Sequence, residues 1–145
     1  MAKLDQVNIV VRNMDAMAEF YRRLGVDVRV DVQSAAPEWA PHHRNNASSD
    51  GIDLDLDSQQ FAAVWNQGWP GGPGIVLGFR LPDRESVDRL FDDLTAAGYT
   101  SQQEPYDAFW GSRYAVIADP DGNAVGLISP PEDDRRTPPP PPPSG

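Results

Sequence analysis

Cysteine is absent from the 145-residue chain, and histidine is almost absent. The lack of cysteine excludes disulfide bonds, thiolate zinc sites and cysteine nucleophiles. The two histidines, His42 and His43, are adjacent in a polar run of the sequence. Because adjacent side chains rarely chelate one ion well, and because histidine is common on polar surfaces, we expect both to lie in a solvated loop.

Basic residues are scarce: 12 Lys and Arg stand against 22 Asp and Glu, a formal net charge of −10 with neutral histidines. Phosphate binding needs clustered Lys and Arg, so we expect no nucleic-acid partner. No apolar run approaches the roughly 20 residues that a membrane span needs, so we expect no membrane partner either. The first residues, MAKLDQVNIVV, lack the layout of a signal peptide, which predicts a cytoplasmic protein.

Residues 130–145 differ in composition from the rest of the chain. This segment, PPEDDRRTPPPPPPSG, contains six consecutive prolines, Pro138 to Pro143. Proline cannot donate a backbone hydrogen bond and favours the polyproline II conformation. Because the segment has few apolar side chains to offset the entropy of ordering, we predict a disordered tail, with a docking peptide for a proline-binding domain as the alternative.

The remaining residues, 1–129, predict two similar halves. Asn13 and Asp83 each precede a helical pattern as N-cap residues, and Gly25 and Gly98 follow these patterns. Alternating apolar residues predict the strands. Each half has the order strand, helix, three strands, which predicts an α+β fold of two βαβββ modules. Module one covers about residues 1–66 and module two about residues 75–129.

The boundaries of the predicted elements follow from these patterns. The helices are expected at residues 14–24 and 84–97. The strands of module one are expected at 6–11, 26–32, 52–57 and 61–65, with a long polar loop between the second and the third. Those of module two are expected at 75–81, 99–105, 113–118 and 123–129, and the glycine-rich segment 68–74 is the expected linker.

Register assigns each strand residue to one of two faces. The apolar set is expected under the two helices and consists of Val7, Ile9, Val11, Ile52, Leu54, Leu56, Leu77, Phe79, Leu81, Val125 and Leu127. The opposite set is polar or small and consists of Gln6, Asn8, Val10, Asp53, Asp55, Asp57, Val76, Gly78, Arg80, Ala124, Gly126 and Ile128. This second face predicts either the wall of a ligand cavity or a sheet face in contact with solvent.

Aromatic residues are expected in or beside loops. They are Trp39, Trp65, Trp69, Phe109 and Trp110, with Tyr106 and Tyr114 nearby in the sequence. Each could either close the end of a cleft by local packing or contact a ligand. As a group beside an acidic sheet face, they indicate a site for a flat or cationic ligand, because rings and carboxylates both attract positive groups.

Two segments carry a family resemblance: VNIVVRNMDAMAEFYRRLG (7–25) and DPDGNAVGL (119–127). With 79–99 and 109–122 between them, the chain resembles the vicinal oxygen chelate superfamily of glyoxalases, extradiol dioxygenases, fosfomycin-inactivating enzymes and bleomycin-binding resistance proteins. The resemblance implies a curled mixed sheet around a cleft and a homodimer. In metal-dependent relatives the ligand positions correspond to Gln6, Val76 and Gly126. Valine and glycine side chains have no donor atoms, so we expect no metal and no cofactor here.

These features together predict a function without metal. The resemblance to the bleomycin-resistance branch implies a binding protein that sequesters a cationic or aromatic natural product or antibiotic. The expected ligand-binding residues are Gln6, Asn8, Asp55, Trp65, Val76, Gly78, Phe109, Trp110, Tyr114 and Gly126. One alternative is a glyoxalase-like lyase, isomerase or dioxygenase with a displaced metal, or with Asp55 or Asp57 as base and Tyr114 as acid. Another is a structural or regulatory module.

Overall fold

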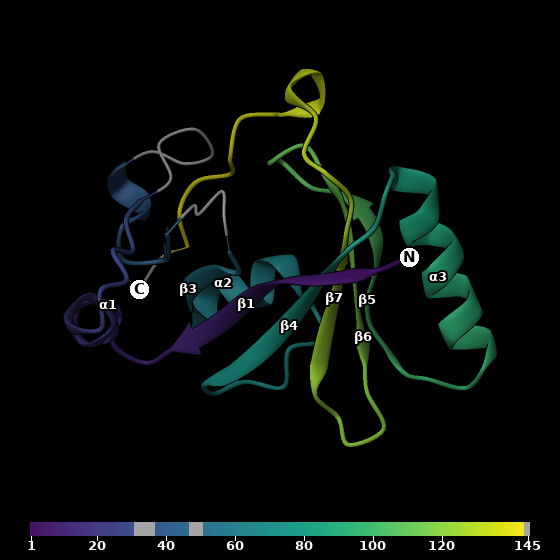
Figure 1. Ribbon diagram of the computed structural model, residues 1–145, viewed down its shortest axis with the longest axis horizontal. Helices are drawn as coiled ribbons and strands as arrows, with labels where there is room; N and C mark the ends of the chain where they lie inside the picture. The colour runs from purple at the N-terminus through teal and green to yellow at the C-terminus, as the bar shows by residue number, and fades with distance from the viewer. Residues whose placement is uncertain (31–36, 47–50, 144–145) are drawn as a thin grey trace.

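One mixed sheet forms the centre of the protein (Figure 1). The computed structural model describes residues 1–30, 37–46 and 51–143. The strand order is β2-β3-β1-β4-β7-β6-β5, and the sheet does not close. The strands are β1 (Lys3–Val11), β2 (His43–Asn45), β3 (Asp53–Ser58), β4 (Gly74–Arg80), β5 (Ser101–Asp107), β6 (Arg113–Ala118) and β7 (Ala124–Ile128). The helices are α1 (Met14–Arg23), α2 (Gln59–Trp65) and α3 (Arg84–Ala96), with 3-10 turns η1 (Pro37–Trp39) and η2 (Asp133–Arg135).

The two halves of the chain join through their first strands. β1 pairs antiparallel with β4, with Val7 opposite Leu77 and Asn8 opposite Val76. Each of these strands also pairs in parallel with a later strand of its own half, β1 with β3 and β4 with β7. The predicted α+β class is therefore confirmed, and both halves contribute to one continuous surface.

The two long helices begin and end where the sequence predicts. The Asn13 side chain accepts a hydrogen bond from the Ala16 N–H at 3.0 Å, and the Asp83 side chain accepts one from the Ser86 N–H at 2.8 Å. Gly25 and Gly98 follow with φ values of +91° and +101°, a backbone conformation that other residues rarely adopt. α1 packs on Val11 and Leu56, whereas α3 packs on β6 and β7.

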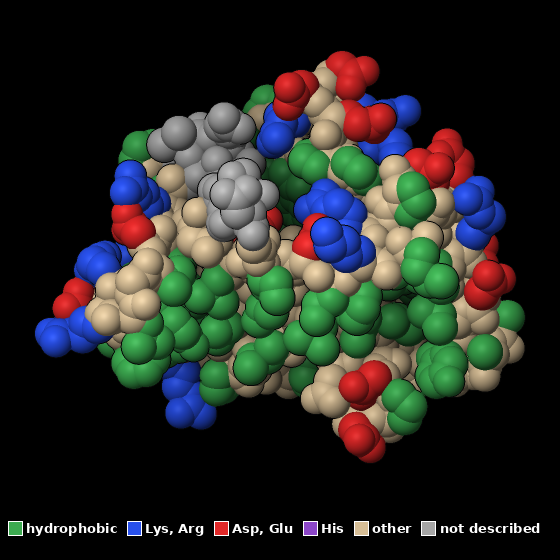
Figure 2. Space-filling model, viewed as in Figure 1, with side chains coloured by type: hydrophobic (Ala, Val, Ile, Leu, Met, Phe, Trp, Pro, Cys, Tyr) green, Lys and Arg blue, Asp and Glu red, His purple; other side chains and the backbone are tan. Residues whose placement is uncertain are grey.

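The middle of the helix-bearing face has no helix over it. α1 and α3 lie at opposite ends of the sheet, and Figure 2 shows a band of hydrophobic side chains between them. Ile52, Ile75 and Leu77 belong to this face and are 51%, 56% and 38% exposed. The expectation that Leu77 packs under the second helix and that Ile52 joins the same buried layer is therefore wrong, because neither helix covers these side chains.

Two predicted strands of the first half are wrong. Residues 61–65 belong to α2, because the Ser58 hydroxyl accepts from the Phe61 N–H at 3.0 Å and caps a helix that buries Phe61, Ala62 and Trp65. Of the strand predicted at 26–32, residues 26–30 contain only the bridge of Arg29 to Asn45, and residues 31–32 lie outside the described part. Within the expected long loop, residues 37–46 contain η1 and β2.

The segment after Pro130 contacts the body of the protein. The Glu132 N–H donates to the Gly111 carbonyl at 3.1 Å, and the Thr137 N–H donates to the Phe109 carbonyl at 3.0 Å. These hydrogen bonds place residues 132–137 against the turn at residues 109–111. The disordered tail expected at residues 130–145 stays a prediction. In the described residues, no helix is long and apolar enough to cross a membrane.

Candidate functional site

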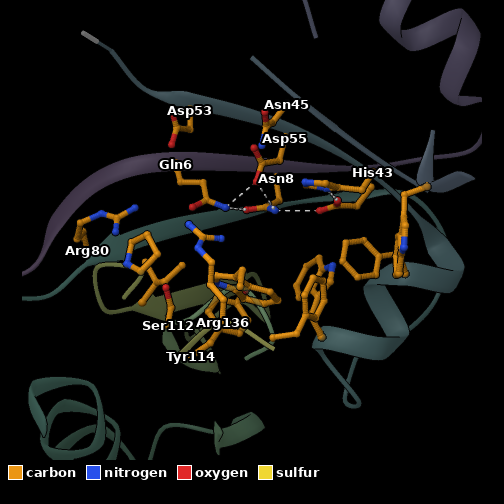
Figure 3. Close-up of a pocket in the computed structure, with 18 residues that line it drawn as sticks. Gln6, Asn8, His43, Asn45, Asp53, Asp55, Arg80, Ser112, Tyr114 and Arg136 are labelled. Carbon is orange, nitrogen blue, oxygen red and sulfur yellow. Dashed lines mark hydrogen bonds and ion pairs between the residues drawn. The ribbon is translucent and has the colours of Figure 1, made fainter. Parts of the chain in front are cut away.

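A pocket opens on the sheet face opposite α1 and α3, and both halves of the chain line it (Figure 3). Its polar wall comes from neighbouring strands. The parallel register of β1 and β3 places Gln6 beside Asp53 and Asn8 beside Asp55. Since alternate strand residues share a face, Asp57 points into the same pocket. The sheet thus presents three carboxylates and two amides on one surface.

Hydrogen bonds hold the two deeper carboxylates of this wall. The Gln6 amide donates to Asp55 at 2.8 Å, and the Asn8 amide donates to Asp57 at 2.9 Å. The other Asp57 oxygen lies 2.6 Å from Nδ1 of His43. Asp55 is 8% exposed and Asp57 is 0% exposed. A buried carboxylate needs such partners, because removing its charge from water without them is very costly.

The sequence prediction for the histidines is wrong. His43 lies in β2 directly opposite Asp57, and its side chain is 14% exposed and lines the pocket. His42 points elsewhere: it is buried, with Nδ1 at 2.8 Å from the Ser58 hydroxyl. His43 and Asn45 are two residues apart and both line the pocket. The alternation of side chains along a strand could therefore have placed these two residues on one face.

Aromatic rings form the wall that faces the carboxylates. They belong to Trp39, Phe61, Trp65, Phe109, Trp110 and Tyr114. Several of these rings pack edge to face, with centroids 4.9 Å apart for Trp39 and Phe61 and 5.6 Å apart for Trp110 and Tyr114. Mutual ring packing of this kind fixes the wall in shape.

Three of the aromatic residues take different places around the pocket. Trp65 is the last residue of α2 and lines the pocket. Trp69 and Tyr106 do not line the pocket but support it from behind. The Trp69 ring covers Gly74, where an added Cβ would come within 2.9 Å of the ring, and the Tyr106 hydroxyl donates to the Trp65 carbonyl at 3.2 Å.

Tyr114 occupies the space above Gly126. A Cβ added to Gly126 would lie 2.9 Å from the Tyr114 hydroxyl oxygen, so the phenol uses room that only glycine leaves. Burial raises the pKa of Tyr114 well above 10, and the nearby Tyr106, Asp57 and Asp55 raise it further. The hydroxyl therefore stays protonated and can donate a hydrogen bond into the pocket.

The ligand positions implied by the family resemblance do not fit a metal in this chain. Gln6 lies on the polar wall, where its amide nitrogen is bonded to Asp55. Val76 is 0% exposed within the core, and Gly126 lies under Tyr114. In the part of the chain that the structure describes, no group of three or more histidine and acidic side chains is placed to hold a metal ion.

The structure brings together seven of the ten residues predicted to bind a ligand. Gln6, Asn8, Asp55, Trp65, Phe109, Trp110 and Tyr114 line the pocket. Val76, Gly78 and Gly126 do not, because Val76 is in the core and the two glycines give room to Gln6 and Tyr114. The sequence-based prediction missed His43, Asn45, Phe61, Ser112, Pro131 and Arg136 as pocket residues. For the ten predicted residues, contact with a ligand stays a prediction.

Two polar atoms in the aromatic wall lack a partner. The Trp65 indole nitrogen and the Ser112 hydroxyl are buried and make no hydrogen bond in the described structure. Both residues are at most 3% exposed. Such unsatisfied buried groups are rare in proteins, and both lie at the pocket.

The fold and the pocket define a two-module α+β protein with a cleft between a polar and an aromatic wall. The sequence matches the model of the glyoxalase/bleomycin resistance protein/dioxygenase superfamily over residues 3–127. The chain therefore belongs to this superfamily. A search of curated proteins finds no match.

Solved structures with the same fold come from several bacteria. An NAD-dependent benzaldehyde dehydrogenase from Legionella pneumophila is 21% identical with a TM-score of 0.61, over 86% of this chain and 96% of that one. Methylmalonyl-CoA epimerase from Mycobacterium tuberculosis is 22% identical with a TM-score of 0.55, over 89% and 88%. A Mn(II)-bound glyoxalase from Novosphingobium aromaticivorans is 18% identical with a TM-score of 0.59, over 89% and 40%. At these identities the likeness concerns the fold.

Proposed function

We propose that the protein binds a small organic cation with a flat or aromatic group, without a metal ion. The observation that carries the proposal is the opposition of the two walls, with Asp55 and Asp57 on one side and six aromatic side chains on the other. A cation between them gains Coulomb attraction from the carboxylates and cation–π attraction from the rings.

The charges around the pocket favour a positive ligand. The guanidinium of Arg80 is paired with Asp5 at 2.7 Å, and this pair offsets its positive charge. The carboxylates of Asp53, Asp55 and Asp57 therefore dominate the polar wall. A cationic aromatic natural product or antibiotic has the matching chemistry, and the superfamily includes bleomycin resistance proteins.

A direct test compares two flat molecules that differ in one charge. Methylacridinium is a permanent cation, whereas acridine is the neutral ring at mildly alkaline pH. We expect methylacridinium to quench tryptophan fluorescence and to bind at least about tenfold more tightly by calorimetry, a difference of about 1.4 kcal/mol. Equal affinity, or no binding of either molecule at high micromolar concentration, contradicts the proposal.

Charge variants test whether the carboxylates of the pocket bind the cation. Asp55→Asn keeps the shape of the side chain and removes one charge from the pocket, so we expect weaker binding of methylacridinium. Asp27→Asn is the matched control, because it changes the net charge equally at an exposed residue that pairs with Arg29. If both variants lose the same affinity, long-range charge and not the pocket attracts the cation.

A second candidate is an enzyme that uses acid–base chemistry, and one observation favours it. His43 and Asp57 form a 2.6 Å pair in the pocket, and Tyr114 is a protonated donor on the opposite wall. A carboxylate-bound imidazole is a suitable general base. Turnover of the methylglyoxal–glutathione adduct that is lost in His43→Gln, with unchanged folding, would establish this function over simple binding.

We also propose a homodimer that buries the bare apolar face of the central strands. Ile52, Ile75 and Leu77 leave this face exposed between α1 and α3. Exposed apolar patches of this kind mark association surfaces. Sedimentation equilibrium of the full chain tests the proposal, and a monomer at micromolar concentration contradicts it.

A further inference from the structure

The segment Pro131–Thr137, which we call the strap, forms one side of the pocket. Pro131 and Arg136 are pocket-lining residues, although the strap follows the last strand of the sheet. Figure 1 shows the chain that follows η2 crossing toward the other end of the molecule. The strap thus contributes two residues to the pocket wall from outside the sheet.

The strap rests on the turn that carries part of the aromatic wall. Two of its backbone N–H groups donate to the carbonyls of Gly111 and Phe109. Gly111 has φ +96°, and a Cβ there would lie 2.5 Å from the Glu132 carbonyl oxygen, so glycine permits the close approach. Arg84 adds a bond to the Gly111 carbonyl at 3.1 Å and an ion pair with Glu132 at 3.3 Å.

The strap has little buried surface compared with the rest of the pocket wall. Six of its seven residues are exposed, and only Arg136 is partly buried. A segment fixed by polar contacts with little buried apolar area opens at low free energy. The strap therefore lacks the buried apolar contacts that hold the aromatic wall together.

The strap places a positive charge inside the acidic pocket. The Arg136 side chain is 25% exposed, and its Nε lies 3.0 Å from Asp133 of the strap itself. Figure 3 shows the guanidinium between Tyr114 and Gln6, pointing toward the polar wall. A cation of the protein already lies on the path between the aromatic rings and the carboxylates.

We propose that Arg136 is an internal competitor for the cation site and that the strap is the gate of the pocket. The inference rests on the proposed binding of an organic cation and adds a charge requirement to it. A ligand must displace the guanidinium or must carry enough positive charge to bind beside it. Cations of higher charge are therefore favoured over monocations, because three wall carboxylates face the guanidinium of Arg136, which is itself paired with Asp133.

The first experiment compares Arg136→Gln with Arg135→Gln in the full chain. Both variants remove one positive charge from the strap, but only Arg136 lines the pocket, and Arg135 is an exposed partner of Glu132. We expect Arg136→Gln to bind methylacridinium about fivefold more tightly, the size of one partly screened charge, and Arg135→Gln to change affinity less than about twofold. Equal effects, or weaker binding in Arg136→Gln, overturn the inference.

A second measurement needs no organic ligand. Caesium ion and acrylamide both quench tryptophan fluorescence by collision, and they differ in charge. We expect Arg136→Gln to increase quenching by caesium but not by acrylamide, whereas Arg135→Gln changes neither. If this holds while methylacridinium does not bind, the proposed function fails and the internal competitor stands. If caesium quenching is unchanged, the competitor fails.

The gate is tested by the hydrogen bond at Thr137. Thr137→Pro removes the N–H that donates to Phe109, and Thr137→Ala keeps it. We expect Thr137→Pro to raise both the association and the dissociation rate of methylacridinium in stopped-flow fluorescence, and Thr137→Ala to match the parent. Unchanged rates in Thr137→Pro mean that the strap does not limit access. Circular dichroism of each variant confirms that the fold is retained.

Discussion

Replacement of Gly126 by alanine tests the packing of the Tyr114 ring against this glycine. The new Cβ would lie 2.9 Å from the Tyr114 hydroxyl oxygen and 3.1 Å from its Cε1. Tyr114 has little freedom to move, because the rings of Trp65, Tyr106 and Trp110 pack around it. Overpacking of this kind costs about 1–3 kcal/mol.

The sign of the effect makes this prediction informative. Gly126 lies within β7 and has no positive φ, so alanine without a clash would stabilise the strand by about 0.5–1 kcal/mol. We therefore expect a net loss of about 1–2 kcal/mol in the free energy of unfolding, measured by urea denaturation. In a Tyr114→Phe background the closest atom is gone, and we expect most of the loss to disappear.

The double-mutant cycle isolates the contact between the two residues. A coupling energy of at least about 1 kcal/mol between the two positions supports the contact, because neighbours couple and distant sites add. If Gly126→Ala is neutral or stabilising in the parent chain, or if its effect is the same in the Tyr114→Phe background, the phenol does not fill this space. The conclusion that Tyr114 packs into the room left by Gly126 would then be refuted.

Three further outcomes are expected. Burial raises the pKa of both Tyr106 and Tyr114, so above about pH 10 the unfolded chain releases these protons first and the free energy of unfolding falls as pH rises. Asp57→Ala leaves the partners of a buried carboxylate unsatisfied, and we expect a loss of about 2–4 kcal/mol in the free energy of unfolding by urea denaturation. Leu77→Lys places a charge on the bare apolar face, and we expect a monomer in sedimentation experiments.

Each of these outcomes has a control. The alkaline loss of stability should shrink in Tyr114→Phe but not in Tyr99→Phe, because Tyr99 is 43% exposed, and equal curves would show that the buried phenols are not responsible. Asp27→Ala at the surface should cost much less than Asp57→Ala. If Leu77→Lys has the same mass in solution as a dimeric parent, the dimer interface does not include this apolar face.

The polar wall could be predicted from the sequence because it depends on local alternation. Gln6 and Asn8 alternate with apolar residues in β1, as Asp55 and Asp57 do in β3, so register alone assigns these side chains to one face. The caps at Asn13 and Asp83 are equally local. What register could not show was that aromatic rings would cover this face.

The errors arise in short segments whose own pattern does not determine their structure. A five-residue apolar run such as 61–65 is too short for its periodicity to distinguish a strand from a buried helix. The Ser58 side chain caps this segment as a helix. His43 enters the pocket only because β2 pairs with β3. Arg136 follows a segment without any pattern, and its place depends on the close approach that Gly111 permits.

The two halves of the chain contribute unequally to the pocket. The acidic and amide groups, together with His43, all come from residues before the linker. The aromatic wall is shared, because Trp39, Phe61 and Trp65 precede the linker and Phe109, Trp110 and Tyr114 follow it. Substitutions around residues 109–114 can therefore reshape the hydrophobic side of the pocket without disturbing the hydrogen-bonded carboxylates. A duplicated scaffold of this kind can acquire new ligands by altering one repeat while the other preserves the charge.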